Sequence, residues 1–112
     1  MSLAADLWAE NADLAAVALA HPFVQGIGDG SLPADRFAGY VAQDAFFLES
    51  FARAYALGAA HSPDRAGLDV FADLLAGVRE ELRLHEGYAA RWGIDLAVVE
   101  PLPATLAYTE FL

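Results

Sequence analysis

The sequence contains no cysteine and no lysine, and each absence excludes a class of function. Without cysteine the 112 residues offer no disulfide, no thiolate metal site and no cysteine nucleophile. All six basic residues are arginines, and sixteen acidic residues bring the formal net charge to −10. Because nucleic acids and anionic membranes attract basic surfaces, we predict that this chain binds neither.

Long apolar runs are also missing from the chain. No run reaches the roughly 18 residues that a membrane-crossing helix needs. The first residues lack the basic start and apolar block of a signal peptide, so we predict a cytoplasmic protein. Even so, 57% of the residues are hydrophobic. Typical soluble domains have about 45–50% with glycine included, so either this chain packs unusually well or part of its apolar surface lies against another chain.

Clusters of proline and glycine divide the chain into four apolar segments. None of the segments shows the two-residue alternation of a β-strand, whereas alanine and leucine at helical spacing are common. The sequence therefore predicts an all-α bundle of long antiparallel helices with short connections. The expected helices cover residues 3–20, residues 33–61, residues 63–92 and a segment that begins near Pro103.

The segment boundaries carry local signals. Residues 23–33, FVQGIGDGSLP, have a GxGxG spacing but no preceding strand and no following Lys-Ser/Thr, so we predict a plain turn rather than a phosphate loop. Ser62 is predicted to cap the third helix, with Pro63 as its first residue. Gly93 is predicted to end that helix.

The stretch FAGYVAQDAFFLESF, residues 37–51, places one carboxylate among large apolar side chains. Steps of three and four residues put Asp44 on the apolar stripe of the second helix and not on its solvent face. The other stripe members are Phe37, Tyr40, Val41, Phe47, Leu48, Phe51 and Tyr55. An unpaired carboxylate in that position costs several kcal/mol or takes up a proton, so it needs a reason.

Two interpretations of Asp44 follow. It could be a polar core residue paired with an arginine or with a buried backbone group. It could also be a pocket carboxylate that binds the N–H groups of a heterocycle, with Tyr40, Phe47 and Phe51 as aromatic walls. The spacing of the residues leaves both interpretations open.

Histidine is scarce, and its spacing does not favour a metal site. Glu81 and His85 stand four residues apart, whereas the di-iron bundle pattern is Glu-x-x-His in two copies with further glutamates. A hydrogen bond between Glu81 and His85 within one helix is the simpler alternative. His21 and His61 lie at segment ends. We predict no metal and no cofactor, and we interpret Tyr108 in isolation as a core residue.

Three ordered stretches give the chain a family resemblance. HPFVQGIGDGSLPADRFAGYVAQDAFFLESFARAYALGAA resembles the start of the TenA/THI-4 family, with Gln43-Asp44 after Tyr40 as its most specific part. EELRLHEGYAARWGI resembles the family's E-x-x-x-H segment, and PLPATLAYTEFL resembles the proline-led entry into the next helix. The matches extend over nearly the whole chain.

The resemblance implies a haem-oxygenase-like helical bundle without haem, commonly assembled as a homotetramer. Many members are thiaminase II enzymes, or aminopyrimidine aminohydrolases, which convert aminomethylpyrimidine to hydroxymethylpyrimidine for thiamin salvage and also split thiamin. No metal or organic cofactor is implied. The implied partners are a small pyrimidine or thiamin-like substrate and further copies of the chain.

Carried over by position, Asp44 matches the family aspartate that hydrogen-bonds the pyrimidine, and Tyr108 matches a tyrosine of the same pocket. Phe47 stands where many members have tyrosine, so one polar pocket group is missing. We therefore predict Asp44 as the catalytic residue that holds the ring. The predicted substrate-binding residues are Asp44, Tyr40, Phe47 and Tyr108.

Length is a second departure, because family members are about twice as long. Their nucleophilic cysteine and a late glutamate correspond to positions beyond Leu112. We interpret residues 1–112 as one partial domain, the N-terminal half of a truncated bundle, which pairs with a C-terminal half. A related oxidase that completes a quinone cofactor fits less well, because it needs a basic pocket that these arginine-poor stripes do not offer.

Two other function classes remain open. One is a catalytically inactive TenA-like domain that binds small molecules or regulates, which Phe47 favours. The other is a structural helical domain that associates with itself through apolar surface.

Overall fold

The computed structural model describes residues 2–112, and this part of the chain is α-helical apart from turns and one 3-10 helix. The all-α prediction is therefore confirmed. By internal contacts the chain divides into two compact units, the first ending at Ala34 and the second comprising Asp35–Leu112. The prediction that residues 1–112 form one partial domain stays a prediction.

The first unit begins with α1 (Leu3–Glu10) and α2 (Ala12–Ala20), where we predicted one helix over residues 3–20. The interruption is Asn11, whose Nδ2 donates to the carbonyl of Leu7 at 2.8 Å. Asparagine side chains compete with the backbone for hydrogen bonds in this way, and this favours helix ends over helix interiors. The prediction of a single helix is wrong at this residue.

The predicted turn over residues 23–33 is mostly a helix, α3 (Pro22–Asp29). Nδ1 of His21 accepts from the Phe23 N–H at 3.1 Å, and Pro22 occupies the first helical turn. These start signals outweigh the cost of about 1 kcal/mol that each helical glycine carries. The helix ends at Gly30, whose φ of +78° suits glycine.

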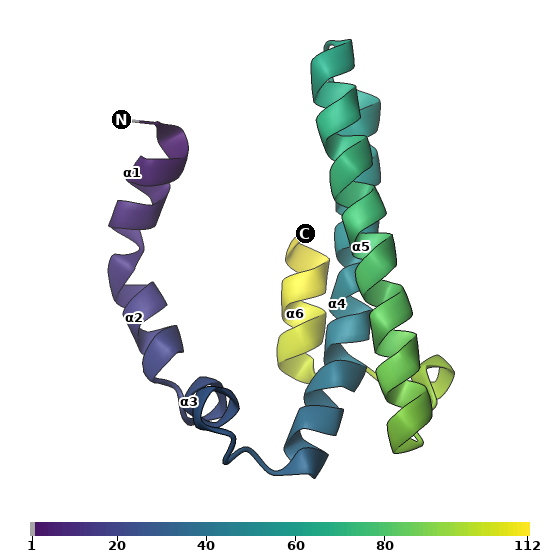
Figure 1. The fold of residues 1–112 in the computed structure, drawn as a ribbon. Coiled ribbons are helices and arrows are strands. Elements are labelled where there is room, and N and C mark those ends of the chain that lie inside the picture. Colours follow the sequence, from purple (N-terminus) through teal and green to yellow (C-terminus); the bar gives the residue numbers. More distant parts are fainter. Residues whose placement is uncertain (1) are drawn as a thin grey trace. The chain divides into compact units, whose positions relative to one another are not determined.

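The second unit is built on two long helices, α4 (Ala34–His61) and α5 (Arg65–Trp92), which run antiparallel (Figure 1). We predicted that Ser62 caps the second of these helices, and this prediction is wrong. Asp64 caps α5 by accepting from the Gly67 N–H at 2.8 Å, whereas the Ser62 hydroxyl donates to the carbonyl of Gly58 at 2.8 Å. Ser62 thus serves the end of α4, where a carbonyl needs a donor.

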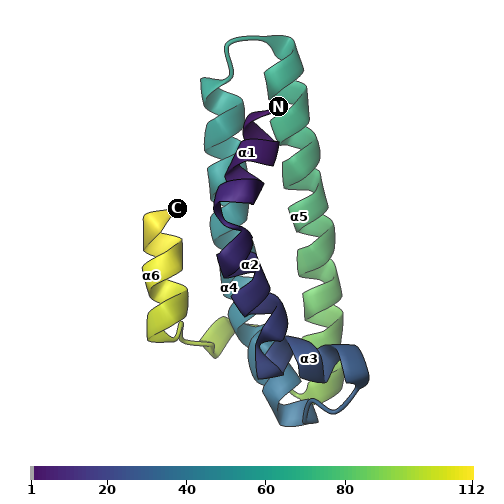
Figure 2. The ribbon, with the colours of Figure 1, turned by 90° about the vertical axis from the view of Figure 1, so that its left-hand side faces the viewer.

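The end of α5 and the start of the last helix follow the prediction. Gly93 has a φ of +68°, and the Ile94 N–H donates to Ala89 O at 2.9 Å. A connection with the 3-10 helix η1 (Leu96–Val98) leads to α6 (Pro103–Phe111), in which Pro103 stands in the first turn. Figures 1 and 2 both show α6 running beside the middle of α4 in the same direction.

The core of the second unit lies between the facing stripes of α4 and α5. Val41 is its most buried large side chain, at 1% exposure, and two polar residues, His85 and Thr105, are buried with it. The other buried apolar residues are Ala45, Leu48, Val78 and Ala89. Within residues 2–112, no helix combines the length and the apolarity that crossing a membrane requires.

Candidate functional site

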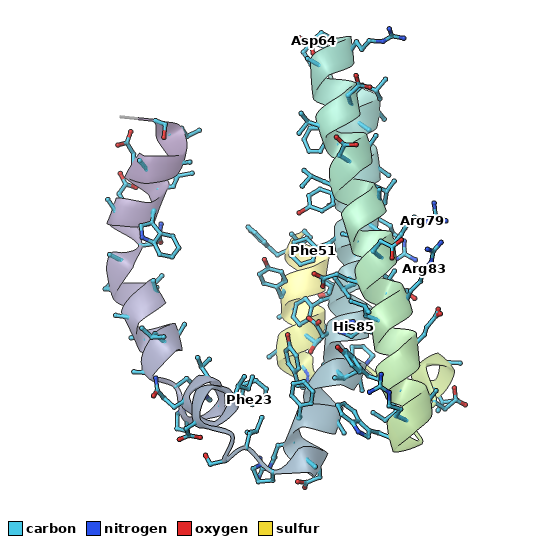
Figure 3. All side chains as sticks on the ribbon, viewed as in Figure 1. Phe23, Phe51, Asp64, Arg79, Arg83 and His85 are labelled. Carbon is cyan, nitrogen blue, oxygen red and sulfur yellow. The ribbon has the colours of Figure 1, made fainter. Side chains whose placement is uncertain are left out.

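Asp44 and His85 join α4 to α5 at the centre of the candidate site. His85 Nε2 lies 2.7 Å from Asp44 Oδ2, and His85 Nδ1 lies 2.8 Å from the backbone carbonyl oxygen of Glu81. The His85 side chain is 9% exposed and that of Asp44 is 23% exposed. His85 lies on the part of α5 that faces α4 (Figure 3). The carboxylate is therefore paired and still accessible.

The two contacts of His85 define where its protons are. A carbonyl oxygen only accepts hydrogen bonds, so Nδ1 must carry a proton and donate to Glu81. The 2.7 Å contact on the other ring nitrogen then needs one further proton, either on His85 or on Asp44. The pair is thus imidazolium with carboxylate, or neutral imidazole with carboxylic acid.

Tyr40 lies one helical turn before Asp44 on α4. Partial burial raises the pKa of the Tyr40 hydroxyl above its ordinary value of 10.0, and the negative charges of Asp44 and Glu81 raise this pKa further. A hydrogen bond with the Asp44 side chain acts in the same direction. Tyr40 therefore stays a neutral hydroxyl beside the carboxylate over the physiological pH range.

The raised pKa predicts an ultraviolet titration with one late tyrosine. The chain has four tyrosines, and we expect Tyr40 to ionise last, above the usual value of about 10. Because the folded state holds this proton more tightly, the stabilisation is complete below pH 10 and is lost as the pH rises through the folded pKa. The late component should be absent in Tyr40→Phe and present in Tyr88→Phe. A late component that survives in Tyr40→Phe would contradict this assignment.

An aromatic wall, formed by Phe47, Phe51 and Tyr108, connects α4 with α6. The Phe47 and Tyr108 rings meet edge to face, with centroids 5.1 Å apart and planes at 66°. Phe51 and Tyr108 have centroids 6.2 Å apart, and Phe51 lies at the level of α6 (Figure 3). These distances are typical of favourable aromatic pairs, so the wall is a packed surface and not an open slot.

An open groove of about 570 Å³ lies between α4 and α5 beside this wall. Phe51 belongs to both the wall and the groove. Leu48 and Glu81 also line the groove, and they lie one helical turn from Asp44 and His85 respectively. The groove lining is otherwise mostly apolar and comprises Tyr55, Val70, Asp73, Leu74, Gly77 and Val78. Asp44 is not among the lining residues.

A second, smaller cavity lies where the connection after α5 covers the helix pair. Its volume is about 260 Å³, and its carboxylates are Glu49 and Glu86. The remaining lining residues are Ala42, Ala45, Phe46, Leu82, Leu96, Ala97 and Val99. None of the predicted site residues is among them, so this cavity is separate from the Asp44–His85 pair.

The structure brings the predicted site residues together as two groups. The first group contains Tyr40 and Asp44, and the second contains Phe47 and Tyr108. The two groups share α4, because Asp44 and Phe47 stand three residues apart on one helix face. Among the described residues, no cluster of three or more histidine, aspartate or glutamate side chains is placed to hold a metal ion.

Our sequence interpretation missed His85 as the partner of Asp44, for which it considered arginine or backbone. His85 also bonds to the backbone of Glu81 within its helix. A signal for the pairing was present, because Asp44 and His85 stand at similar distances in sequence from the turn between α4 and α5, and His85 continues the helical spacing of Val78 and Leu82. Residues so placed on antiparallel helices face each other.

Comparison with known proteins agrees with the family resemblance. Residues 8–112 match the model of the TENA/THI-4/PQQC family. The chain is 40% identical over 116 residues to an aminopyrimidine aminohydrolase of Halalkalibacterium halodurans, covering 100% of this chain and 52% of that protein.

Two more proteins with the same name are also similar. The chain is 40% identical over 96 residues to that of Bacillus subtilis, covering 82% of this chain and 41% of the relative. It is 34% identical over 98 residues to that of Helicobacter pylori, covering 84% and 45%. The chain therefore spans about half the length of these curated relatives or less. On the match over residues 8–112, the chain belongs to the TENA/THI-4/PQQC family.

Proposed function

We propose that this chain contributes the pyrimidine-binding part of a hydrolase that acts on thiamin-derived aminopyrimidines or on thiamin. Asp44 holds the ring, Tyr40 supports Asp44, and Phe47 and Tyr108 provide the apolar contact. The relatives named aminopyrimidine aminohydrolase support the reaction class. The attacking nucleophile comes from a C-terminal segment, and the active protein is a homo-oligomer.

The chemistry of an aminopyrimidine suits this arrangement. The ring is flat and apolar on its faces and carries N–H donors and ring nitrogens at its edge. A carboxylate offers about four lone-pair sites, so its contacts with His85 and Tyr40 leave sites for a ligand N–H. Because the proton shared by Asp44 and His85 lies in their mutual contact, the remaining lone pairs of Asp44 bind the ring edge as acceptors.

The observation that carries the proposal is the 2.7 Å contact between His85 Nε2 and Asp44 Oδ2 at a carboxylate that remains 23% exposed. Asp44 contacts His85 of α5, and it stands three residues before Phe47 of the aromatic wall on the same helix. In small-molecule sites, a few polar groups among mostly apolar side chains fix the orientation of the ligand, and an accessible Asp44 near the wall suits this role.

The direct test is an assay of the whole protein, as its gene encodes it, with 4-amino-5-aminomethyl-2-methylpyrimidine and with thiamin. We expect release of ammonia from the aminopyrimidine or of the thiazole from thiamin, with saturation kinetics. Calorimetry on the same preparation measures binding separately. Binding without turnover would favour the alternative, a catalytically inactive domain that binds small molecules or regulates. If the protein neither binds nor turns over these compounds, the proposal is contradicted.

A further inference from the structure

We infer that Gln43 is a positioning residue that fixes α6, and with it Tyr108, against the aromatic face of α4. The inference rests on the proposed function only in treating the Phe47–Tyr108 contact as part of the ligand site. Gln43 precedes Asp44 in the chain, and the proposal above assigns it no role. Its side chain makes contacts that no other residue in the site duplicates.

The Gln43 amide bridges α4 to the start of α6 through three hydrogen bonds. Its Oε1 accepts from the Leu102 N–H at 2.9 Å and from the Thr105 hydroxyl at 2.7 Å. Its Nε2 donates to the carbonyl of Glu100 at 3.1 Å. Both neighbours of the oxygen are donors and the neighbour of the nitrogen is an acceptor, so one orientation of the amide satisfies all three contacts.

The first turn of α6 depends on this bridge. The N-cap residue, Leu102, has no side-chain hydrogen bond of its own, so the helix start lacks the usual polar cap. Gln43 instead accepts from the N–H of this N-cap residue, which is the contact that the N3 side chain makes in a capping box. Thr105 is only 5% exposed, and without Gln43 its buried hydroxyl would lose its partner.

Because α6 is short, the position of this helix depends on the hydrogen bonds of Gln43. The helix has nine residues, and isolated helices shorter than about 12 residues are marginal in water. Its placement therefore comes from contacts with α4. Along the two helices these contacts occur as a polar pair, Gln43 with Thr105, and one turn later an aromatic pair, Phe47 with Tyr108. Removal of the polar pair leaves the aromatic pair without a fixed register.

Two substitutions at Gln43 separate its hydrogen bonds from its volume. Gln43→Met has similar size and flexibility but accepts no strong hydrogen bond. Gln43→Glu keeps an oxygen that can accept from Leu102 and Thr105 but loses the donor to Glu100. We expect the methionine variant to release α6 and the glutamate variant to retain most of its position.

The primary measurement is fluorine NMR of the whole protein labelled with 3-fluorotyrosine, in which Tyr108→Phe assigns the Tyr108 signal. In Gln43→Met we expect this signal to shift or broaden, and we expect faster hydrogen exchange at the Leu102 amide. In Gln43→Glu both properties should stay near those of the parent protein. Tyr88, whose ring packs on Trp92 and not on the aromatic wall, provides the internal reference signal.

Kinetics give a second measurement on the same variants. Because the wall contacts the ligand before and during reaction, Gln43→Met is expected to raise KM for the aminopyrimidine roughly tenfold with a smaller change in kcat. In Gln43→Glu we expect KM to stay close to that of the parent protein. A merely structural role would lower the amount of active protein, and therefore kcat, and leave KM unchanged.

The outcomes distinguish this inference from the proposed function. An unchanged Tyr108 signal and unchanged exchange at Leu102 in Gln43→Met would overturn the inference, whatever the activity. A parent protein that binds no pyrimidine would overturn the proposed function, while the NMR measurement still decides the role of Gln43. If Gln43→Met fails to fold, Thr105→Val removes one of the same hydrogen bonds, and a Tyr108 signal unmoved in that variant would also count against the inference.

Discussion

Asp44→Ala lowers kcat/KM of the whole protein for an aminopyrimidine by on the order of 10²-fold, which is the largest effect on activity that we expect. A hydrogen bond to a charged group is worth about 1.5–3 kcal/mol, and each 1.4 kcal/mol corresponds to a factor of ten. The variant removes the ligand contact and also leaves His85 Nε2 without its partner at 2.7 Å. Steady-state measurement of ammonia release gives the number.

Asp44→Asn separates the charge of Asp44 from its structural role. The asparagine amide can donate to the Nε2 of a neutral His85, so the contact between α4 and α5 survives. We expect normal folding, measured by circular dichroism and thermal unfolding, together with a loss of turnover of roughly tenfold or more. Turnover equal to that of the parent in this variant would remove Asp44 from the proposed mechanism.

Glu49→Gln is the matched control for both variants. Glu49 lies on the same helix, one to two turns after Asp44, and lines the separate cavity of about 260 Å³. Neutralising it removes one negative charge from α4 without touching the Asp44–His85 pair. We expect kcat/KM to stay within about twofold of the parent value, because exposed charges contribute little at this distance. An equal loss in Glu49→Gln would point to a general electrostatic effect.

Gly58→Ala has the largest expected effect on stability. A Cβ atom at Gly58 would lie 2.6–2.8 Å from three carbons of the Phe71 ring, well inside contact distance. Overpacking of this kind costs about 1–3 kcal/mol, and it opposes the gain of up to about 1 kcal/mol that alanine usually brings to a helix. We expect a net loss of up to about 2 kcal/mol in the free energy of unfolding, measured in urea.

Gly39→Ala is the control on the same helix. A Cβ atom at Gly39 would meet nothing within 4 Å, so only the helix propensity changes. We expect this variant to gain about 0.5–1 kcal/mol in the free energy of unfolding. The two substitutions are chemically identical and should differ in sign. If Gly58→Ala also stabilised the protein, the close packing of α4 on α5 at Phe71 would be wrong.

Much of the helical plan could be predicted from the residues alone. The stripe at steps of three and four placed Asp44 on the inner face of α4, and the glycine at position 93 marked the end of α5. Both are local properties, because helical periodicity and cap conformation depend on neighbours in the chain. The errors were also local: Asn11, Asp64 and the start of α3 each involve competition between nearby cap signals, which spacing alone does not rank.

The sequence by itself determined the fold class, the family motifs and the exceptional position of Asp44. Only the tertiary structure decided what that carboxylate contacts. Its partner His85 comes from another helix, and Gln43 reaches Thr105 across a long stretch of chain. Such contacts depend on the register of packed helices, which many stripe positions could satisfy equally well in sequence. The register is chosen by the fit of side chains such as Gly58 against Phe71, and that fit exists only in three dimensions.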